Sequence, residues 1–301
     1  MGLTIDLGFC REQSIAGGEP IAGSAIASTP IFVALEHPGA WGARAIEDSD
    51  LSDAIKARLG AWEEHPVGVR VQLVRREAPS GARTLLVACC ELGRARTVAI
   101  TLHDVDDLLA VDLDAIVAAL RGGAEVPGAV EVDRPQLLVC TNGRRDRCCA
   151  KWGLAVYRAL DATSIETWQT THLGGHRFAA TLLWLPHGIC FGRLTPDEAA
   201  GLVAAIERGE IDPIDRLRGR ICASAAEQAA EAEWRRRSGS RGVDDIVAIE
   251  HDAIAPDAWR VRLRDAAGTW HAIDVVHERT SELVSPSCGK PPAPVMRWRF
   301  G

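Results

Sequence analysis

Apolar and polar residues follow a regular order of patterns over the first 129 residues of the chain. Short apolar runs rich in Val, Ile and Leu are typical of buried strands, and apolar residues that recur every three or four positions indicate helices. The patterns predict one strand, a helix, three strands and a second helix. The strands are expected over residues 31–36, 69–75, 83–90 and 96–102, and the helices over 51–64 and 113–121.

The next part of the chain, residues 130–215, repeats this order. Thr195 before Pro196 favours a helix start, because threonine caps helices and proline suits the first helical position. Because the same order of strands and helices occurs twice, we predict two related α/β units in tandem. In each unit a helix connects two parallel strands and the later strands form hairpins. Strands are expected over 136–140, 165–170, 178–185 and 189–193, and helices over 149–161 and 196–208.

The last part of the chain has a different pattern. A boundary is expected at residues 213–219, followed by a helix rich in Ala, Glu and Arg over 223–237. Prolines 291, 292 and 294 exclude a helix near the end and predict an extended tail. Strands are expected over 244–250, 257–264 and 269–277. We therefore expect three parts, residues 1–129, 130–215 and 216–301, of which the third is a small C-terminal α+β module.

Composition and charge limit the kinds of partner that the chain is expected to bind. The chain is 47% hydrophobic and carries a formal net charge of −7, which argues for a globular protein and against a nucleic acid or an anionic membrane as partner. No apolar run reaches the roughly 18 residues of a membrane span, and the first residues lack the basic and apolar segments of a secretory signal. We expect a cytoplasmic protein.

Nine cysteines are many for such a protein. In the cytoplasm they are interpreted as ligands, reactive thiols or buried apolar residues before disulfides. Cys288 follows Ser287 and precedes Gly289, so we expect it in a loop, where it is a candidate reactive thiol. Five others lie among apolar or small residues and are interpreted as core residues: Cys10, Cys89, Cys90, Cys190 and Cys222.

The remaining three cysteines lie close together in the sequence. Cys140 ends a predicted strand, and Cys148 and Cys149 follow a loop containing glycine, arginine and aspartate, with Cys149 at the start of a helix. A helix N-terminus stabilises a thiolate. Eight residues separate Cys140 from Cys149, more than the two to four usual when two cysteines hold one zinc. The spacing therefore favours an iron–sulfur cluster, with Cys148 as the competing ligand.

Two histidines follow at loop spacing. His172 and His176 flank Gly174 and Gly175, which are poor helix formers and favour a turn. Imidazole together with thiolate is the ligand set of a structural zinc or of a [2Fe–2S] cluster of mixed ligation. Charged residues beside the two motifs, with Asp146 and Arg177 among them, could connect the cysteine loop to the histidine loop by an ion pair.

These motifs, C-x-x-G-x-R-D-x-C-C from Cys140 and H-x-G-G-H-R-F-A from His172, resemble the sucrase/ferredoxin-like family. Segments 30–41 and 287–289 extend the resemblance over most of the chain. The family has a thioredoxin-like ferredoxin domain, which implies tandem thioredoxin-like domains here, the first of them degenerate because it lacks the ligands. The resemblance implies one [2Fe–2S] cluster, with Cys140 and Cys149 on one iron and His172 and His176 on the other.

We therefore expect an electron-transfer protein rather than a self-contained enzyme. The sequence contains none of the common nucleotide-binding, esterase or metalloprotease motifs. Electrons would come from a separate flavin- or NAD(P)H-dependent reductase and pass to an acceptor. Two alternatives use the same residues: a zinc-stabilised binding module with the four ligands, and a thioredoxin-like thiol oxidoreductase using Cys148 or Cys149. The lack of C-x-x-C spacing weakens the second alternative.

Overall fold

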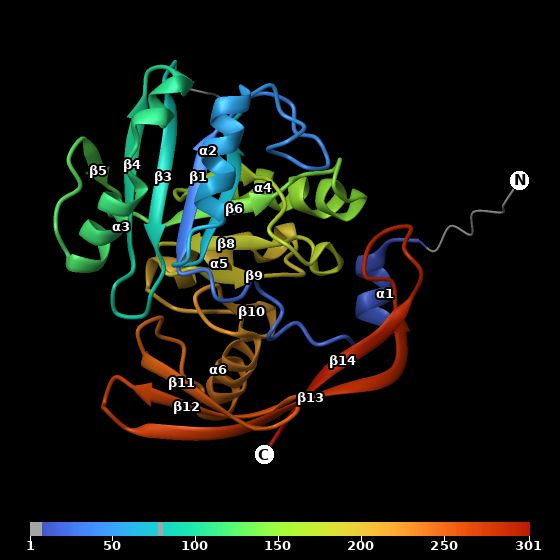
Figure 1. The fold of residues 1–301 in the computed structure, drawn as a ribbon. Helices are drawn as coiled ribbons and strands as arrows, with labels where there is room; N and C mark the ends of the chain where they lie inside the picture. The colour runs from blue at the N-terminus through green and yellow to red at the C-terminus, as the bar shows by residue number, and fades with distance from the viewer. Residues whose placement is uncertain (1–7, 78–80) are drawn as a thin grey trace, which may run out of the picture.

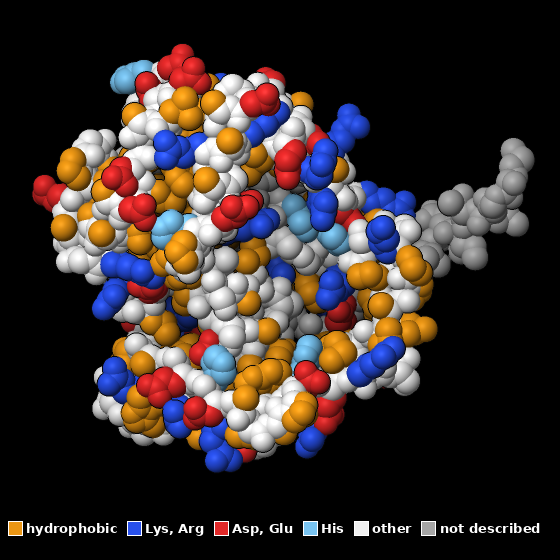
Figure 2. Space-filling view, in the orientation of Figure 1, with side chains coloured by type: hydrophobic (Ala, Val, Ile, Leu, Met, Phe, Trp, Pro, Cys, Tyr) orange, Lys and Arg blue, Asp and Glu red, His pale blue; other side chains and the backbone are white. Residues whose placement is uncertain are grey.

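The computed structural model describes residues 8–77 and 81–301. A ten-stranded mixed sheet with helices against it occupies most of the molecule, and a four-stranded antiparallel sheet lies beside it (Figure 1). The predicted α/β class and the separate C-terminal sheet are therefore confirmed. Acidic and basic side chains are interspersed over the face shown in Figure 2. In the described part of the chain, no helix combines the length and the apolar character that a membrane span requires.

The first half of the large sheet contains the predicted strand–helix–three-strand–helix order. Its strands lie in the order β2-β1-β3-β4, with β1 parallel to β2 and antiparallel to β3. Helix α2 connects the two parallel strands, and the short strand β5 was not predicted. The elements are β1 (Ile31–Glu36), α2 (Asp53–Glu63), β2 (Val69–Arg75), β3 (Arg83–Cys89), β4 (Arg96–Leu102), the 3-10 helix η1 (Val105–Ala110), α3 (Leu113–Gly122) and β5 (Ala129–Glu131).

The second half repeats the arrangement of the first. Its strands lie in the order β7-β6-β8-β9, with β6 parallel to β7 and antiparallel to β8, so both order and direction match those of the first half. The two halves meet where β2 pairs antiparallel with β7. The elements are β6 (Gln136–Cys140), the π-helical turn η2 (Cys149–Gly153), α4 (Leu154–Asp161), β7 (Glu166–Thr170), η3 (His176–Phe178), β8 (Leu182–Leu185), β9 (Ile189–Phe191), η4 (Pro196–Glu198) and α5 (Ala199–Glu207).

One predicted strand of this half is too long. Residues 178–185 were expected to be extended throughout, but a 3-10 turn ends at Phe178 and β8 begins only at Leu182. The carbonyl of Phe178 accepts a hydrogen bond from the backbone N–H of Arg193 in place of a ladder bond. Residues 178–185 are mostly apolar because the turn is buried as well as the strand. An apolar sequence indicates burial, and it does not distinguish a buried turn from a buried strand.

The large sheet continues past residue 215. After the 3-10 helix η5 (Ile214–Arg216), strand β10 (Leu217–Arg220) pairs antiparallel with β9 and forms one edge of the sheet. Its sequence, Leu-Arg-Gly-Arg, was interpreted as part of a boundary. Both arginines are buried, Arg218 against backbone carbonyls and Arg220 against Glu231. Polar residues thus form an edge strand here because partners on neighbouring segments satisfy them.

The C-terminal part is a helix against an antiparallel sheet of order β11-β12-β13-β14. The predicted extended tail is strand β14, paired with β13. Because β13 is longer than predicted, its end and β14 run under the large sheet and reach the N-terminal helix α1 (Cys10–Ala16), which was not predicted (Figure 1). The elements are α6 (Ala225–Ser238), β11 (Ile246–Ala255), β12 (Ala258–Asp265), β13 (Trp270–Val284) and β14 (Ala293–Phe300).

Three hydrophobic clusters hold the large sheet together. One lies under α2 and α3, and a second lies under α4 and α5. The third joins the two halves, since Phe32 and Val74 of the first half pack in one cluster with Leu138 and Trp168 of the second. This cluster also contains Cys140 and Cys149. The first half therefore contributes to the packing around the predicted ligands.

A buried charged group joins α6 to the edge of the large sheet. Glu231 accepts hydrogen bonds from Nε of Arg220 on β10, at 3.0 Å from each carboxylate oxygen, and from Nε of Arg235, at 2.9 Å. The three side chains are at most 3% exposed. Burial alone would raise the pKa of Glu231, but the two guanidinium groups outweigh it and lower the pKa. The carboxylate is therefore charged in the folded protein at neutral pH.

The variant Glu231→Ala is expected to lower the free energy of unfolding by about 3–5 kcal/mol, because it leaves two buried guanidinium groups without a counter-charge. Glu233→Ala on the same helix is the control. Its partners Arg236 and Arg237 are about half exposed, so we expect a loss below about 1 kcal/mol. Urea unfolding at pH 7 measures the free energy of unfolding of both variants, and an equal decrease in the two would contradict the prediction.

The same group makes stability depend on pH. The pKa of Glu231 in the folded protein lies below its unfolded value of about 4.3. Its contribution to the free energy of unfolding is therefore complete above the unfolded pKa, and it is lost as the pH falls through the folded pKa. The difference in unfolding free energy between the wild type and Glu231→Ala should therefore shrink in acid.

Candidate metal centre

The first predicted ligand lies at the end of a central strand. Cys140 is the last residue of β6, which pairs with β7 on one side and β8 on the other. Its side chain is 1% exposed. The backbone N–H of Cys140 donates to Thr181, and that of Thr141 donates to Thr170, so hydrogen bonds fix the strand end on both sides. The sheet therefore presents this thiol at a fixed position.

The second thiol is brought to the first by a helix start. The π-helical turn η2 begins at Cys149, but the backbone is already helical at Arg147 and Cys148, so the helical segment starts two residues earlier than predicted. At Gly153 an added Cβ would lie 2.0 Å from the carbonyl oxygen of Cys140. Because only glycine permits this approach, Gly153 lets the helical turn pack directly on the end of β6. Cys149 is thereby held beside Cys140, equally buried.

The histidines reach the thiols from a glycine loop after β7. Gly174 and Gly175 adopt φ values of +78° and +65°, which favour glycine, and the segment is a loop as predicted. Nδ1 of His172 lies 3.8 Å from the sulfur of Cys140 and 3.8 Å from that of Cys149. The ring of His176 stacks on that of His172, with 3.3 Å between its Nδ1 and Nε2 of His172.

The structure thus brings Cys140, Cys149 and His172 together within ligand distance of one another, with His176 stacked on His172, and it separates the two adjacent cysteines. The sulfur of Cys149 faces His172, whereas that of Cys148 lies 3.4 Å from Cys10 and 3.3 Å from Cys288. Nothing in the sequence pattern groups Cys148 with Cys10 and Cys288. Because Cys148 lies 138 positions from Cys10 and 140 positions from Cys288 in the sequence, no local spacing connects them.

The expected ion pair between the two loops does not involve Arg177. Arg177 pairs with Glu19 at 2.7 Å and does not reach the cysteine loop. Asp146 instead places Oδ2 at 3.8 Å from Nε2 of His176. A carboxylate behind a histidine is a common way to orient a ligating imidazole. Asp146 therefore connects the loops through the histidine.

The protonation states suit metal binding. A hydrogen bond with Cys149 lowers the pKa of Cys140 well below its ordinary value, and His172 lowers it further, although burial opposes them. The same bond and burial raise the pKa of Cys149. Burial lowers the pKa of His176, against the effect of Asp146. These shifts favour a thiolate at Cys140 and a neutral imidazole at His176, the forms that bind metals.

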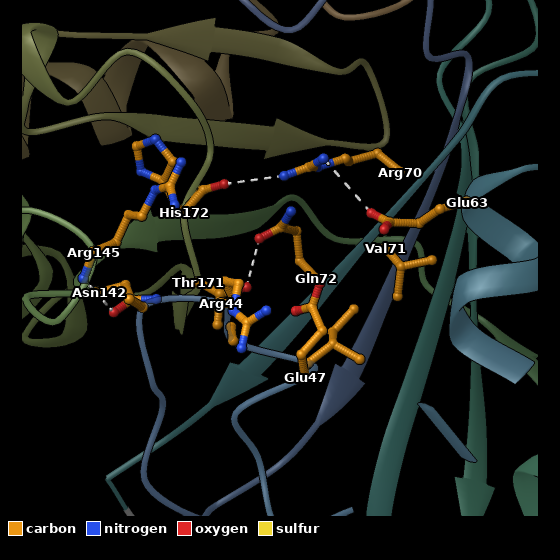
Figure 3. A pocket seen from close by; sticks show the side chains of 13 residues that line it. Arg44, Glu47, Glu63, Arg70, Val71, Gln72, Asn142, Arg145, Thr171 and His172 are labelled. Atoms are coloured by element: carbon orange, nitrogen blue, oxygen red, sulfur yellow. Dashed lines mark hydrogen bonds and ion pairs between the residues drawn. The ribbon is translucent and has the colours of Figure 1, made fainter. Parts of the chain in front are cut away.

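A polar cavity of about 220 Å³ borders the site at His172. It lies between the two halves of the large sheet, since Arg70 and Gln72 come from β2 whereas Asn142 and Thr171 come from the second half. Figure 3 shows Arg70 reaching the backbone carbonyl of His172, at 3.4 Å, and Glu63. The thiols are buried, so this cavity is an approach to the site from the histidine side.

These features define an α/β protein with a duplicated strand order and a candidate Cys/His metal centre at the ends of its central strands. Residues 25–219 match the sucrase/ferredoxin-like family, and the chain belongs to that family.

A relative in Meyerozyma guilliermondii, "Altered inheritance of mitochondria protein 32", is 27% identical over 96 residues. The alignment covers 28% of this chain and 34% of the relative, so the chain spans about a third of that protein's length. No solved structure matches the chain significantly.

Proposed function

We propose that the chain is an electron-transfer protein with one [2Fe–2S] cluster, held by Cys140 and Cys149 on one iron and by His172 and His176 on the other. The observation that carries the proposal is the meeting of two buried thiols and two stacked imidazoles at one end of the sheet. Soft thiolate and imidazole donors fit the two irons of such a cluster. When bound, the cluster supplies one-electron oxidation and reduction.

We further propose that each half of the large sheet is a thioredoxin-like domain, with the first degenerate. The order β7-β6-β8-β9, with a helical connection between parallel strands and a following hairpin, supports this description. In the first half, β1 ends at Glu36 and His37 instead of a cysteine. We retain residues 1–129, 130–215 and 216–301 as the proposed parts, the third contributing β10 to the sheet.

The partners and location also belong to the proposal. Electrons come from a separate flavin- or NAD(P)H-dependent reductase and leave to an acceptor, and the cavity beside His172, which Arg44 and Arg145 also line, is the approach for such a partner. The net charge of −7 and the interspersed surface charges support the absence of nucleic-acid and membrane partners. The cytoplasmic location stays a prediction from the sequence.

Analysis of freshly purified protein tests the proposal. We expect about two irons and two acid-labile sulfides per chain, with a red-brown colour. Zinc without sulfide at this site would support the zinc-binding module instead. A colourless protein without metal would support the thiol oxidoreductase, although both Cys148 and Cys149 are at most 1% exposed, which is unfavourable for a reactive thiol.

A further inference from the structure

Three cysteines from distant segments meet beside the proposed cluster site. Cys10 opens helix α1, Cys148 directly precedes η2, and Cys288 lies in the connection between β13 and β14. The three sulfurs form a nearly equilateral triangle, with separations of 3.4 Å, 3.3 Å and 3.6 Å. Cys10 and Cys148 are fully buried and Cys288 is partly exposed.

The triangle has the dimensions of a metal ligand set. Sulfurs that share a tetrahedral zinc at Zn–S distances of about 2.3 Å lie roughly 3.8 Å apart, a few tenths of an ångström from the separations here. A disulfide would bring two of the three sulfurs together and leave the third out. Three equivalent contacts therefore favour one shared ion over a pairwise bond.

A carboxylate lies at the same place. Oδ1 of Asp146 is 4.0 Å from the sulfur of Cys10 and accepts the backbone N–H of Cys148 at 2.8 Å. Its Oδ2 accepts the hydroxyl of Ser287 and the backbone N–H of Cys288, each at 3.0 Å. Asp146 thus fixes the segments that carry two of the thiols, and it offers an oxygen to a fourth coordination position.

The surroundings suit a bound cation with thiolate ligands. Phe9 and Trp152 pack against the thiols, which keeps the group dry. Three cations surround these rings: Arg147 and Lys151 lie over Phe9, and Arg11 lies over Trp152. Three thiolates and one carboxylate with a divalent ion carry a net charge of −2, and the nearby cations offset that charge.

We propose that Cys10, Cys148 and Cys288, with Asp146, form a second metal site for a thiophilic divalent cation, with Zn²⁺ as its occupant. Binding releases one proton from each of the three thiols to solvent. The ion connects helix α1 and the β13–β14 connection to the cysteine loop, so it holds both ends of the chain on the second half of the sheet. The site uses none of the four proposed cluster ligands.

Metal content of the full-length protein tests this proposal. Protein kept reduced and supplied with Zn²⁺ should retain about one zinc per chain after gel filtration with a weak chelator. Cys10→Ser and Cys288→Ser should bind zinc at least tenfold more weakly while they keep the iron and sulfide of the wild type. Cys222→Ser, a free cysteine outside both groups, is the control and should keep both metals.

Iron and zinc report on the two sites separately. Cys140→Ser should lose iron and keep zinc, so failure of the cluster proposal would leave the zinc result intact. X-ray absorption at the zinc edge of the wild type, which needs no variant to fold, should show three sulfurs and one oxygen around the metal. A zinc shell without sulfur, a wild type that retains no zinc, or unchanged zinc affinity in Cys10→Ser and Cys288→Ser would overturn the proposal.

Discussion

Replacing Cys140 by serine should remove the visible absorption of the protein and reduce its iron to below about a tenth of the wild-type content. A serine hydroxyl stays protonated at neutral pH and is a harder donor than a thiolate, so it does not hold a cluster iron in the same way. Cys140 is buried at the end of β6, and hydrogen bonds fix the backbone on both sides of it. No solvent ligand can therefore take the place of the sulfur. Cys149→Ser should have the same effect.

The adjacent Cys148 provides the matched control. Its sulfur faces Cys10 and Cys288, so Cys148→Ser should keep the colour and the iron. Absorption spectra and iron and sulfide analysis of the three variants, together with circular dichroism to check folding, measure the outcome. A coloured Cys149→Ser beside a colourless Cys148→Ser would move the ligand to Cys148 and contradict the site.

The first strand of each half could be predicted because it is a nearly continuous apolar run. Ile31–Glu36 and Gln136–Cys140 are buried along their whole lengths, so their composition reports their position directly. The histidine loop could also be predicted, since the glycines between the histidines require a turn. The choice of Cys149 over Cys148 came from the resemblance to the family.

Other features could not be predicted, because long-range contacts determine them. Strand β10 contains two arginines whose burial depends on Glu231 and on backbone carbonyls from other segments. Cys10 has the apolar neighbours of a core residue, and it is indeed buried, yet its contacts with Cys148 and Cys288 join opposite ends of the chain. A single sequence contains no signal for contacts between such distant residues.

The histidines should give the cluster a reduction potential well above that of all-cysteine ferredoxins. Two neutral imidazoles replace two thiolates and remove negative charge from one iron. Mixed ligation of this kind gives potentials of about −150 to +300 mV, against about −400 mV for plant-type ferredoxins. Replacing either His172 or His176 by cysteine should therefore keep a cluster and lower the potential by on the order of 100 mV or more. Protein-film voltammetry measures the shift, and the exposed His103→Cys is the control.

The same ligands should couple the electron to a proton. A ligating imidazole keeps a second N–H, and Nε2 of His176 lies 3.8 Å from the carboxylate of Asp146, which favours keeping a proton there. An oxidised iron withdraws electron density and makes this N–H more acidic, whereas a reduced iron favours its retention. The potential should therefore fall as the pH rises through the alkaline range, approaching about 59 mV per pH unit for one electron and one proton. In His172→Cys and His176→Cys the slope should be smaller. A wild-type potential that stays constant from acid to alkaline pH, or an unchanged slope in both variants, would show that these histidines do not hold the iron.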